Sequence, residues 1–367
     1  MVCYDTATGG AFFLAAGGRG MTRAIPQTMQ AARYHGPGAA LQVETVPVPT
    51  VGGGEALIRI THAGVCRTEL HFLSGLLNLG IAPLTLGHEI VGEVVLAGAG
   101  VGTAQPGDRV IVNYYGTCGQ CVWCRTGQQN LCSHVVAQLG FTADGGYAEF
   151  VKARADMLVP LPAHLDAAEA CTLGCSATTA LHAARCIAPV QLGDTVLIYG
   201  AGGVGYALVQ VCKLSGAQVL VVGRSERKLQ LAQQLGADAV IHAGQEPVAE
   251  TVRRLTGNEG VDIIFELVGT RETMDQSLQS LRKRGRLVFI GYSADQLIAN
   301  PLLLVIGELQ ILASVGSTQQ DLLDAVALAS SGKLRQVIDR IVPLTQVNEA
   351  LQAMQRGEVA GRAVLQP

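Results

Sequence analysis

The hydrophobic residues of this chain follow two different rhythms, one before and one after about residue 190. From Gln30 onward, short runs alternate apolar and polar side chains and are bounded by Gly or Pro, at Ala56–Ile60, Ile90–Leu96 and Arg109–Asn113. A period of two is typical of strands with one buried face. We therefore expect an antiparallel, barrel-like domain in the first half of the chain.

Beyond residue 190 the apolar runs become continuous and alternate with helical stretches. Thr195–Tyr199 is an uninterrupted apolar run of the kind found in parallel strands buried on both faces. The elements predicted after it are a helix at Val204–Leu214, a strand at Gln218–Val222, a helix at Arg227–Leu235, strands at Ala239–His242 and Val261–Phe265, a helix at Thr273–Leu281 and a strand at Arg286–Ile290. This β-α-β order indicates a doubly wound parallel sheet, hence an α/β fold.

The two ends of the chain do not continue either of these patterns. After about residue 316, helical spacing over Asp321–Ala329 and Val347–Met354 is followed by a short strand at Gly361–Leu365. This tail is too small to fold alone, so we expect it to return to the first domain. The expected domains are 29–180 with 316–367, and 181–315. Residues 1–28 are rich in Gly and Ala, and we expect a disordered extension, with Met21 and Met29 as alternative starts.

The charge balance excludes several classes of protein. The chain has 367 residues, of which 15% are charged, and its net charge is −3, so it carries no basic field for nucleic acid or an anionic membrane. No apolar run is long enough to span a membrane, and the N-terminal run Ala11–Ala16 lacks the basic segment of a signal peptide. We expect a cytoplasmic protein, in which ten cysteines point to metal binding or reactivity before disulfides.

A glycine-rich loop joins the first buried strand to the helix after it. Gly200, Gly202 and Gly205 match G-x-G-x-x-G, and the strand-loop-helix setting makes this match specific for a dinucleotide. Glycines let the backbone approach the pyrophosphate, and the helix N-terminus offers free N–H groups to the phosphates.

The end of the next strand bears on which dinucleotide is bound. An acidic residue there would accept bonds from the ribose hydroxyls of NAD(H), but this strand ends in Gly223-Arg224-Ser225, with Arg227 and Lys228 just beyond. Guanidinium and hydroxyl groups suit a 2′-phosphate, so NADP(H) is favoured over NAD(H). The alternative is that Arg224 and Arg227 are merely solvated residues at the start of a helix.

Four cysteines form a compact ladder in the first half. Cys118, Cys121, Cys124 and Cys132 follow C-x2-C-x2-C-x7-C in a segment with several glycines. Four thiolates around one tetrahedral ion leave no position for water, which predicts a structural zinc. Free cysteines or two disulfides are the alternatives.

A second set of donors is dispersed along the chain. A catalytic zinc needs about three protein ligands and one open position. Cys66 and His88 can supply two of them, and Cys175 is the candidate third, with Cys171 as a competitor one helical turn earlier.

Taken in order, these motifs resemble the zinc-containing alcohol dehydrogenases of the medium-chain dehydrogenase/reductase superfamily. The similarity runs from about residue 30 to the C-terminus and comprises C-R-T-x-L-H, G-H-E, the four-cysteine loop, the late cysteine four residues before Thr179, and the glycine-rich loop. It implies a GroES-like β-barrel catalytic domain joined to a Rossmann cofactor domain. It also implies Cys66, His88 and Cys175 as catalytic zinc ligands, and an assembly of two or four copies, for which the apolar region Leu302–Leu312 offers an interface edge.

The resemblance also assigns roles to side chains around this centre. Thr68 matches the hydroxyl that takes the proton of the alcohol, His71 the histidine that passes it to solvent, and Glu89 a carboxylate close to the metal. Similar proteins have Asp where this chain has Glu69, so the bonding of that acid to the ligand histidine is open. Leu73, Leu77 and Tyr114 fall near positions that line the substrate pocket. The implied cofactor contacts are Arg67, Thr179, Gly200, Gly202, Gly203, Val204, Gly205, Gly223, Arg224, Ser225 and Lys228.

The expected activity is hydride transfer between an alcohol, or an aldehyde or ketone, and NADP(H) or NAD(H), with two zinc ions per chain. Two rivals remain. The segment from Gly285 to Thr318 also resembles NADPH-dependent acryloyl-CoA reductases, which act on a C=C bond. A cofactor-binding protein of this fold without activity is the second rival, and the full ligand set argues against it.

Overall fold

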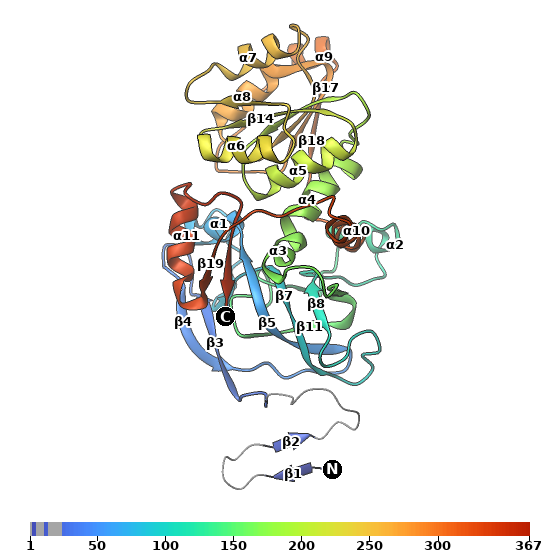
Figure 1. The fold of residues 1–367 in the computed structure, drawn as a ribbon, viewed down its shortest axis with the longest axis vertical. Coiled ribbons are helices and arrows are strands. Elements are labelled where there is room, and N and C mark those ends of the chain that lie inside the picture. The colour runs from blue at the N-terminus through green and yellow to red at the C-terminus, as the bar shows by residue number, and fades with distance from the viewer. Residues whose placement is uncertain (1, 5–10, 14–23) are drawn as a thin grey trace.

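The computed structural model describes residues 2–4, 11–13 and 24–367 (Figure 1). Strands β1 (Val2–Tyr4) and β2 (Ala11–Phe13) pair antiparallel. Most of the segment for which we expected disorder, 1–28, lies outside the described residues, and Thr28 already begins strand β3. Among the described helices, none is both long and apolar enough to cross a membrane.

The first half is built mainly from antiparallel strands, and only β19 and β20 among its described strands pair in parallel. Its largest sheet has the order β12-β8-β7-β5-β20-β19, with β11 also pairing with β5, and a second sheet has the order β4-β3-β6. The strands are β3 (Thr28–Tyr34), β4 (Gln42–Pro47), β5 (Glu55–Val65), β6 (Leu84–Thr85), β7 (Glu89–Ala97), β8 (Arg109–Val112), β9 (Tyr115–Gly116), β10 (Ala137–Gln138), β11 (Phe150–Arg154), β12 (Leu158–Pro160), β19 (Ile338–Pro343) and β20 (Arg362–Gln366). β5 is longer than predicted because it pairs with three neighbours, β7, β11 and β20.

This half also contains several short helices, and some of them hold candidate site residues. They are α1 (Arg67–Ser74), α2 (Val122–Arg125), α3 (Ala167–Thr172), α4 (Thr178–His182), α10 (Gln319–Ser330) and α11 (Val347–Gln355). Between α3 and α4 the helix widens into a π-helical turn, η3 (Leu173–Ala177), and another such turn, η4 (Ala183–Ile187), follows α4. Since π-turns are uncommon and concentrate at functional sites, the position of η3 draws attention to the residues on it.

The second half is the predicted doubly wound sheet. Its six strands are all parallel, in the order β15-β14-β13-β16-β17-β18. Successive strands are added towards one edge up to β15 and towards the other edge from β16, so the strand order reverses between β13 and β16. Ligands of such sheets bind at the carboxyl ends of the strands beside this reversal. The elements are β13 (Thr195–Tyr199), α5 (Gly203–Leu214), β14 (Gln218–Gly223), α6 (Glu226–Gln234), β15 (Ala239–His242), α7 (Val248–Leu255), β16 (Val261–Glu266), α8 (Arg271–Ser280), β17 (Leu281–Phe289), α9 (Pro301–Gly307) and β18 (Gln310–Ala313).

The fold class is therefore as expected, whereas several element boundaries differ, and the largest change concerns β17. Leu281, predicted to end a helix, instead begins β17, because it pairs with Val261 across a bulge in the sheet. The two halves lie one above the other in Figure 1, and the chain crosses between them through the α3–α4 helix and again before α10. Polar contacts also bridge them: Arg227 of α6 pairs with Asp339 of β19 at 2.8 Å.

Candidate active site

The three donors expected from the dispersed motifs come together between the two halves. Cys66 is the N-cap residue of α1, His88 directly precedes β7, and Cys175 lies on the π-helical turn η3. One donor atom of each, together with a carboxylate oxygen of Glu89, lies within 4.8 Å of the others, and His88 Nε2 is 3.3 Å from Cys175 Sγ. All four residues are buried.

The chemistry of this donor set fits zinc. Two thiols and an imidazole are the donors that zinc prefers, and bonds of about 2.0–2.3 Å put tetrahedral ligand atoms about 3.3–3.8 Å apart, as His88 and Cys175 are. The hydrogen bond between the two thiols lowers the pKa of Cys66 and raises the pKa of Cys175. An ion that accepts both sulfurs as thiolates would replace this shared proton.

Glu69 braces two of these donors at once. Its Oε1 lies 2.9 Å from His88 Nδ1, which directs Nε2 towards the cluster, and its Oε2 accepts a 2.9 Å hydrogen bond from the backbone N–H of Cys66. The second bond closes a capping box at the start of α1. Glutamate therefore retains the contact with the ligand histidine despite its extra methylene.

Glu89 is fully buried, and Arg362 of β20 compensates its charge. Arg362 Nε donates to Glu89 Oε1 at 3.0 Å, and its Nη2 lies 3.8 Å from Cys66 Sγ. Burial raises the pKa of Glu89 to about 7, although the charge of Arg362 opposes this. A Cβ at Gly64 would overlap Glu89 Oε2, so glycine at that position makes room for the carboxylate. Glu89 thus lies beside the donor cluster in direct contact with the guanidinium of Arg362.

The two residues expected to move the proton follow the cluster along α1. Thr68 Oγ1 lies 3.5 Å from Cys66 Sγ, so the hydroxyl is beside the donor set. His71 lies one turn further on and is half-buried. Burial, followed by the charge of Arg67, lowers the pKa of His71, which favours a neutral imidazole able to accept a proton.

Aromatic rings lie close to His88. Tyr114 and Phe141 lie with their ring centroids 5.1 and 5.2 Å from that of His88. Leu73 and Leu77 pack against the same apolar core. Tyr114 was expected at the pocket, whereas Phe141 was not, because nothing in its local sequence distinguishes it from a core residue.

Cys171, the competing candidate, does not join the cluster. It is buried on α3, and its thiol donates to the carbonyl of Ala168 at 3.2 Å. A third group of potential ligands, His182, Cys186 and Asp321, lies at the α4–α10 contact. Here His182 Nδ1 is 3.0 Å from Asp321 Oδ2, and that oxygen also accepts bonds from Thr318, so we interpret the group as a structural link.

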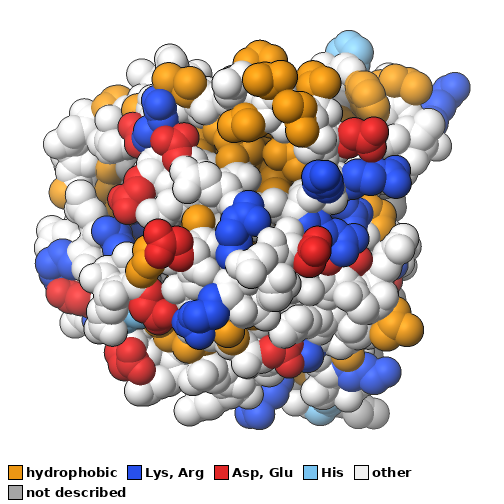
Figure 2. Space-filling view, turned by 90° about the horizontal axis from the view of Figure 1, so that it is seen from above, with side chains coloured by type: hydrophobic (Ala, Val, Ile, Leu, Met, Phe, Trp, Pro, Cys, Tyr) orange, Lys and Arg blue, Asp and Glu red, His pale blue; other side chains and the backbone are white. Residues whose placement is uncertain are grey.

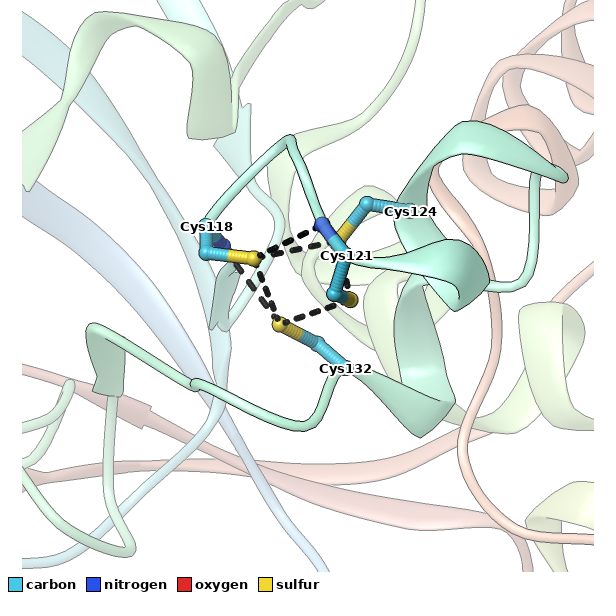
Figure 3. Close-up of side chains that lie close together, drawn as sticks. All are labelled: Cys118, Cys121, Cys124 and Cys132. Carbon is cyan, nitrogen blue, oxygen red and sulfur yellow. Dashed lines mark hydrogen bonds between the residues drawn. The ribbon is translucent and has the colours of Figure 1, made fainter.

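The four-cysteine ladder closes into a compact shell (Figure 3). The separations between its sulfurs are 3.5 Å for Cys121–Cys124, 3.6 Å for Cys118–Cys132, and 3.9 Å for both Cys118–Cys124 and Cys121–Cys132. A tetrahedron of sulfurs 2.3 Å from zinc has edges of about 3.8 Å. Backbone N–H groups of Cys118, Cys121 and His134 point at these sulfurs at 3.4 Å, an arrangement that stabilises thiolates. The cysteines between Cys66 and Cys212 carry no disulfide.

The glycine-rich loop has the geometry that its motif requires. Gly200 ends β13 with a φ of 128°, which only glycine adopts readily, and Gly202 is the N-cap of α5. A Cβ at Gly205 would overlap the carbonyl oxygen of Gly200, and one at Gly203 would lie 2.5 Å from Arg362 Nη1. Val204 continues the first turn of α5, and Thr179 is buried on α4. Arg362 therefore connects the donor cluster with the loop.

Basic residues gather at the tip of β14. Lys228 is half-buried on α6, and burial, followed by the charge of Arg67, lowers its pKa, with smaller contributions from Arg227 and Arg224. Gly223 ends the strand without a carboxylate, and Ser225 caps α6. Arg227 already pairs with Asp339, so Arg224, Ser225 and Lys228 are the groups free to meet a ligand.

Sequence reasoning missed Arg362, whose partners lie 273 and 296 residues away. One signal was present. Arg362 opens the apolar run Arg362-Ala-Val-Leu365, and an arginine in a strand of that kind is seldom buried without a partner.

Comparison with known families assigns both halves of the chain. Residues 52–163 match the alcohol dehydrogenase GroES-like domain, and residues 203–331 match the zinc-binding dehydrogenase family. A curated relative, the NAD-dependent alcohol dehydrogenase of Sulfurisphaera tokodaii, is 34% identical over 350 residues, which are 92% of this chain and 100% of the relative.

Solved structures agree with this assignment. The alcohol dehydrogenase of Aeropyrum pernix superposes with a TM-score of 0.87 at 34% identity, covering 92% of this chain and 100% of that one. AibC superposes with a TM-score of 0.85 at 38% identity, covering 93% of this chain and 96% of that one.

Proposed function

Because this chain belongs to the zinc-type alcohol dehydrogenases of the medium-chain dehydrogenase/reductase superfamily, we propose that it interconverts an alcohol and an aldehyde or ketone with a nicotinamide cofactor and a zinc ion. Alcohol dehydrogenase activity is supported by the relatives. The zinc requirement and the preferred cofactor belong to the proposal.

One observation carries the proposal. Cys66, His88 and Cys175 converge within 4.8 Å, at a place where the start of α1, the turn η3 and the residue before β7 meet. Three soft donors are the set found in catalytic zinc sites, which keep a position for substrate. A zinc ion held there would polarise the substrate oxygen and make its proton easier to remove.

The surrounding side chains then have separate tasks. Glu69 orients His88, and Arg362 keeps the negative charge of Glu89 compensated beside the two thiols. Thr68 takes up the proton of the alcohol as its own hydroxyl proton moves on towards the neutral imidazole of His71, which passes a proton to solvent. The rings of Tyr114 and Phe141 exclude water, which strengthens each electrostatic interaction in the site.

We propose NADP(H) as the preferred cofactor, although the Sulfurisphaera relative is named as NAD-dependent. Lys228, Arg224 and Arg67 place positive charges near one another at the tip of β14, where Gly223 stands in the position expected for an acid in NAD(H)-binding sheets. A 2′-phosphate would relieve the repulsion among these charges.

Arg224→Ala tests the cofactor assignment. Loss of a charge-assisted bond should lower kcat/KM with NADP(H) about tenfold or more and leave the value with NAD(H) nearly unchanged. Arg227→Ala is the matched control, because Arg227 pairs with Asp339 and should leave the preference between cofactors unaltered. Equal losses with both cofactors would contradict the proposal.

The activity itself is tested with a panel of alcohols, aldehydes, ketones and enoyl thioesters, each with both cofactors, combined with metal analysis. We expect turnover of alcohols and carbonyls, and two zinc ions per chain. Turnover restricted to enoyl thioesters would replace this function by C=C reduction, and no turnover of any substrate would favour a cofactor-binding protein without activity.

We also propose that the protein is a homodimer or homotetramer that works in the cytoplasm. Exposed apolar side chains gather at the end of the molecule that carries α9, the end seen in Figure 2. Leu302, Leu303, Val305 and Ile306 are each at least 60% exposed, beside the edge strand β18. An edge strand flanked by such a patch can pair with the same strand of a second copy. Val305→Glu should therefore reduce the mass measured by light scattering to that of one chain.

A further inference from the structure

The imidazole of His71 is stacked on a ring from the opposite half of the molecule. The centroids of His71 and Tyr292 are 4.6 Å apart, and their planes are inclined by 29°. His71 belongs to α1 of the first half, whereas Tyr292 follows the end of β17 in the parallel sheet. The two residues are 221 positions apart in the chain (292 − 71), so this contact depends on how the halves are assembled.

Tyr292 is held in place by the backbone around it. A Cβ at Gly291 would overlap the backbone of Leu267, and one at Gly269 would lie 2.6 Å from Tyr292 Cα, so the loops after β16 and β17 are in direct contact. Ser293 Oγ donates to the carbonyl of Gly269 at 2.6 Å, which fastens the two loops together. The backbone of Tyr292 is therefore held in place, and its ring, in a residue that is 46% exposed, forms the platform on which His71 stacks.

The ring of His71 is not fixed by its helix alone. Helix α1 fixes its backbone, whose carbonyl accepts bonds from Leu77 N and Ser74 Oγ. The side chain is half-buried, and several orientations of the imidazole would be compatible with the helix. The stack on Tyr292 selects one of them.

We propose that Tyr292 is a positioning residue for the proton relay, holding the imidazole of His71 in the orientation that receives the proton. This inference rests on the relay assigned to His71 in the proposed function. Because Tyr292 moves with the parallel sheet, a rotation of one half against the other would withdraw the platform. The relay is then aligned only in the assembled arrangement of the halves.

The contact can be tested without turnover. In the full-length, zinc-loaded protein without cofactor, the ring current of Tyr292 should shift the Cε1 proton resonance of His71 in NMR spectra of histidine-labelled protein, with His71→Gln identifying the signal. Tyr292→Phe should retain the shift, and Tyr292→Leu should abolish it. An unchanged resonance in Tyr292→Leu would overturn the contact and leave the proposed function standing.

The role is tested by a double-mutant cycle. Displacing a proton-transfer group should lower kcat about tenfold in Tyr292→Leu, while Tyr292→Phe should remain within about twofold of wild type. In a His71→Gln background, Tyr292→Leu should cause little further loss, because it acts through the missing imidazole. Fully additive losses, or an equal defect in Tyr292→Phe, would overturn the proposal. Absence of activity in the unmodified protein would instead refute the proposed function.

Discussion

The two thiol clusters of this molecule differ in what holds them together. The four cysteines of the ladder lie within a segment of 15 residues (118–132), on a loop whose short helix α2 buries no residue. Cys66, His88 and Cys175 come from three separate elements and are buried. Glu69 and Arg362 brace them from outside the cluster.

This difference indicates that an ion would stabilise the fold at the ladder, whereas it would mainly supply chemistry at the buried cluster. We expect a loop without a core of its own to obtain its shape from a bound ion, so metal binding there would contribute folding energy. The buried cluster is already assembled by packing and hydrogen bonds, so an ion there supplies chemistry more than stability. The following changes test this contrast.

Cys175→Ala should have the largest effect and should act on turnover. Loss of one donor should reduce kcat/KM by about 10³-fold or more while the melting temperature changes little. Cys171→Ala is the matched control, since that cysteine lies one turn earlier, is equally buried and is outside the cluster. Steady-state kinetics and calorimetry measure both quantities. A comparable kinetic loss in Cys171→Ala would mean that the cluster has been assigned to the wrong cysteine.

Cys132→Ser should act on stability instead. Opening the closed shell should lower the melting temperature by about 5–10 °C and the zinc content from two ions to one. Cys186→Ser, at an exposed position outside the ladder, should leave both unchanged. If Cys132→Ser retained two zinc ions and full stability, the loop would not depend on metal.

Glu69→Gln should weaken only the buried site. Losing the charge that orients His88 should lower zinc affinity there by about 10- to 100-fold, as measured by chelator competition. The four-cysteine site of the same molecule is the internal control. Equal loss at both sites would point to general destabilisation.

Asp321→Asn should have the smallest effect, of about 1–2 kcal/mol at pH 7. Burial alone would raise the pKa of Asp321, but the bonds from His182 and Thr318 outweigh burial and lower it. A lowered pKa in the folded state means that the contribution is complete above about pH 3.9, the unfolded value, and disappears as the pH falls through the folded value. Urea unfolding from pH 7 to pH 3 should show the two curves converging in acid. Asp324→Asn, which removes an exposed pair with Arg185, should cost much less at any pH.

Sequence patterns predicted those features of the fold that depend on residues close together in the chain. The strands Thr195–Tyr199 and Ala239–His242 were located to the residue, because continuous apolar runs between glycines have few alternatives in a buried sheet. The cysteine ladder was identifiable for the same reason, since its ligands are close in sequence. Helix α9 and strand β18 were missed because their apolar residues are exposed and give no one-sided pattern.

The remaining parts of the site depend on contacts between distant segments. The bond of Glu69 to Cys66 N is short-range, but its contact with His88 requires β7 to lie against α1. Tyr292 and Arg362 reach the site from elements that the sequence places far away. Chemistry-bearing residue types were therefore predictable, and the groups that orient them were not.

Strand β20 sets an order of events during synthesis. It lies between β5 and β19, yet it is translated after every strand of the parallel sheet. The barrel-like half cannot close until β20 has been synthesised. By that time all six strands of the parallel sheet, β13 to β18, have been synthesised. The inserted unit can thus fold first, and the half encoded first finishes last, completed by the same strand that delivers Arg362 to Glu89.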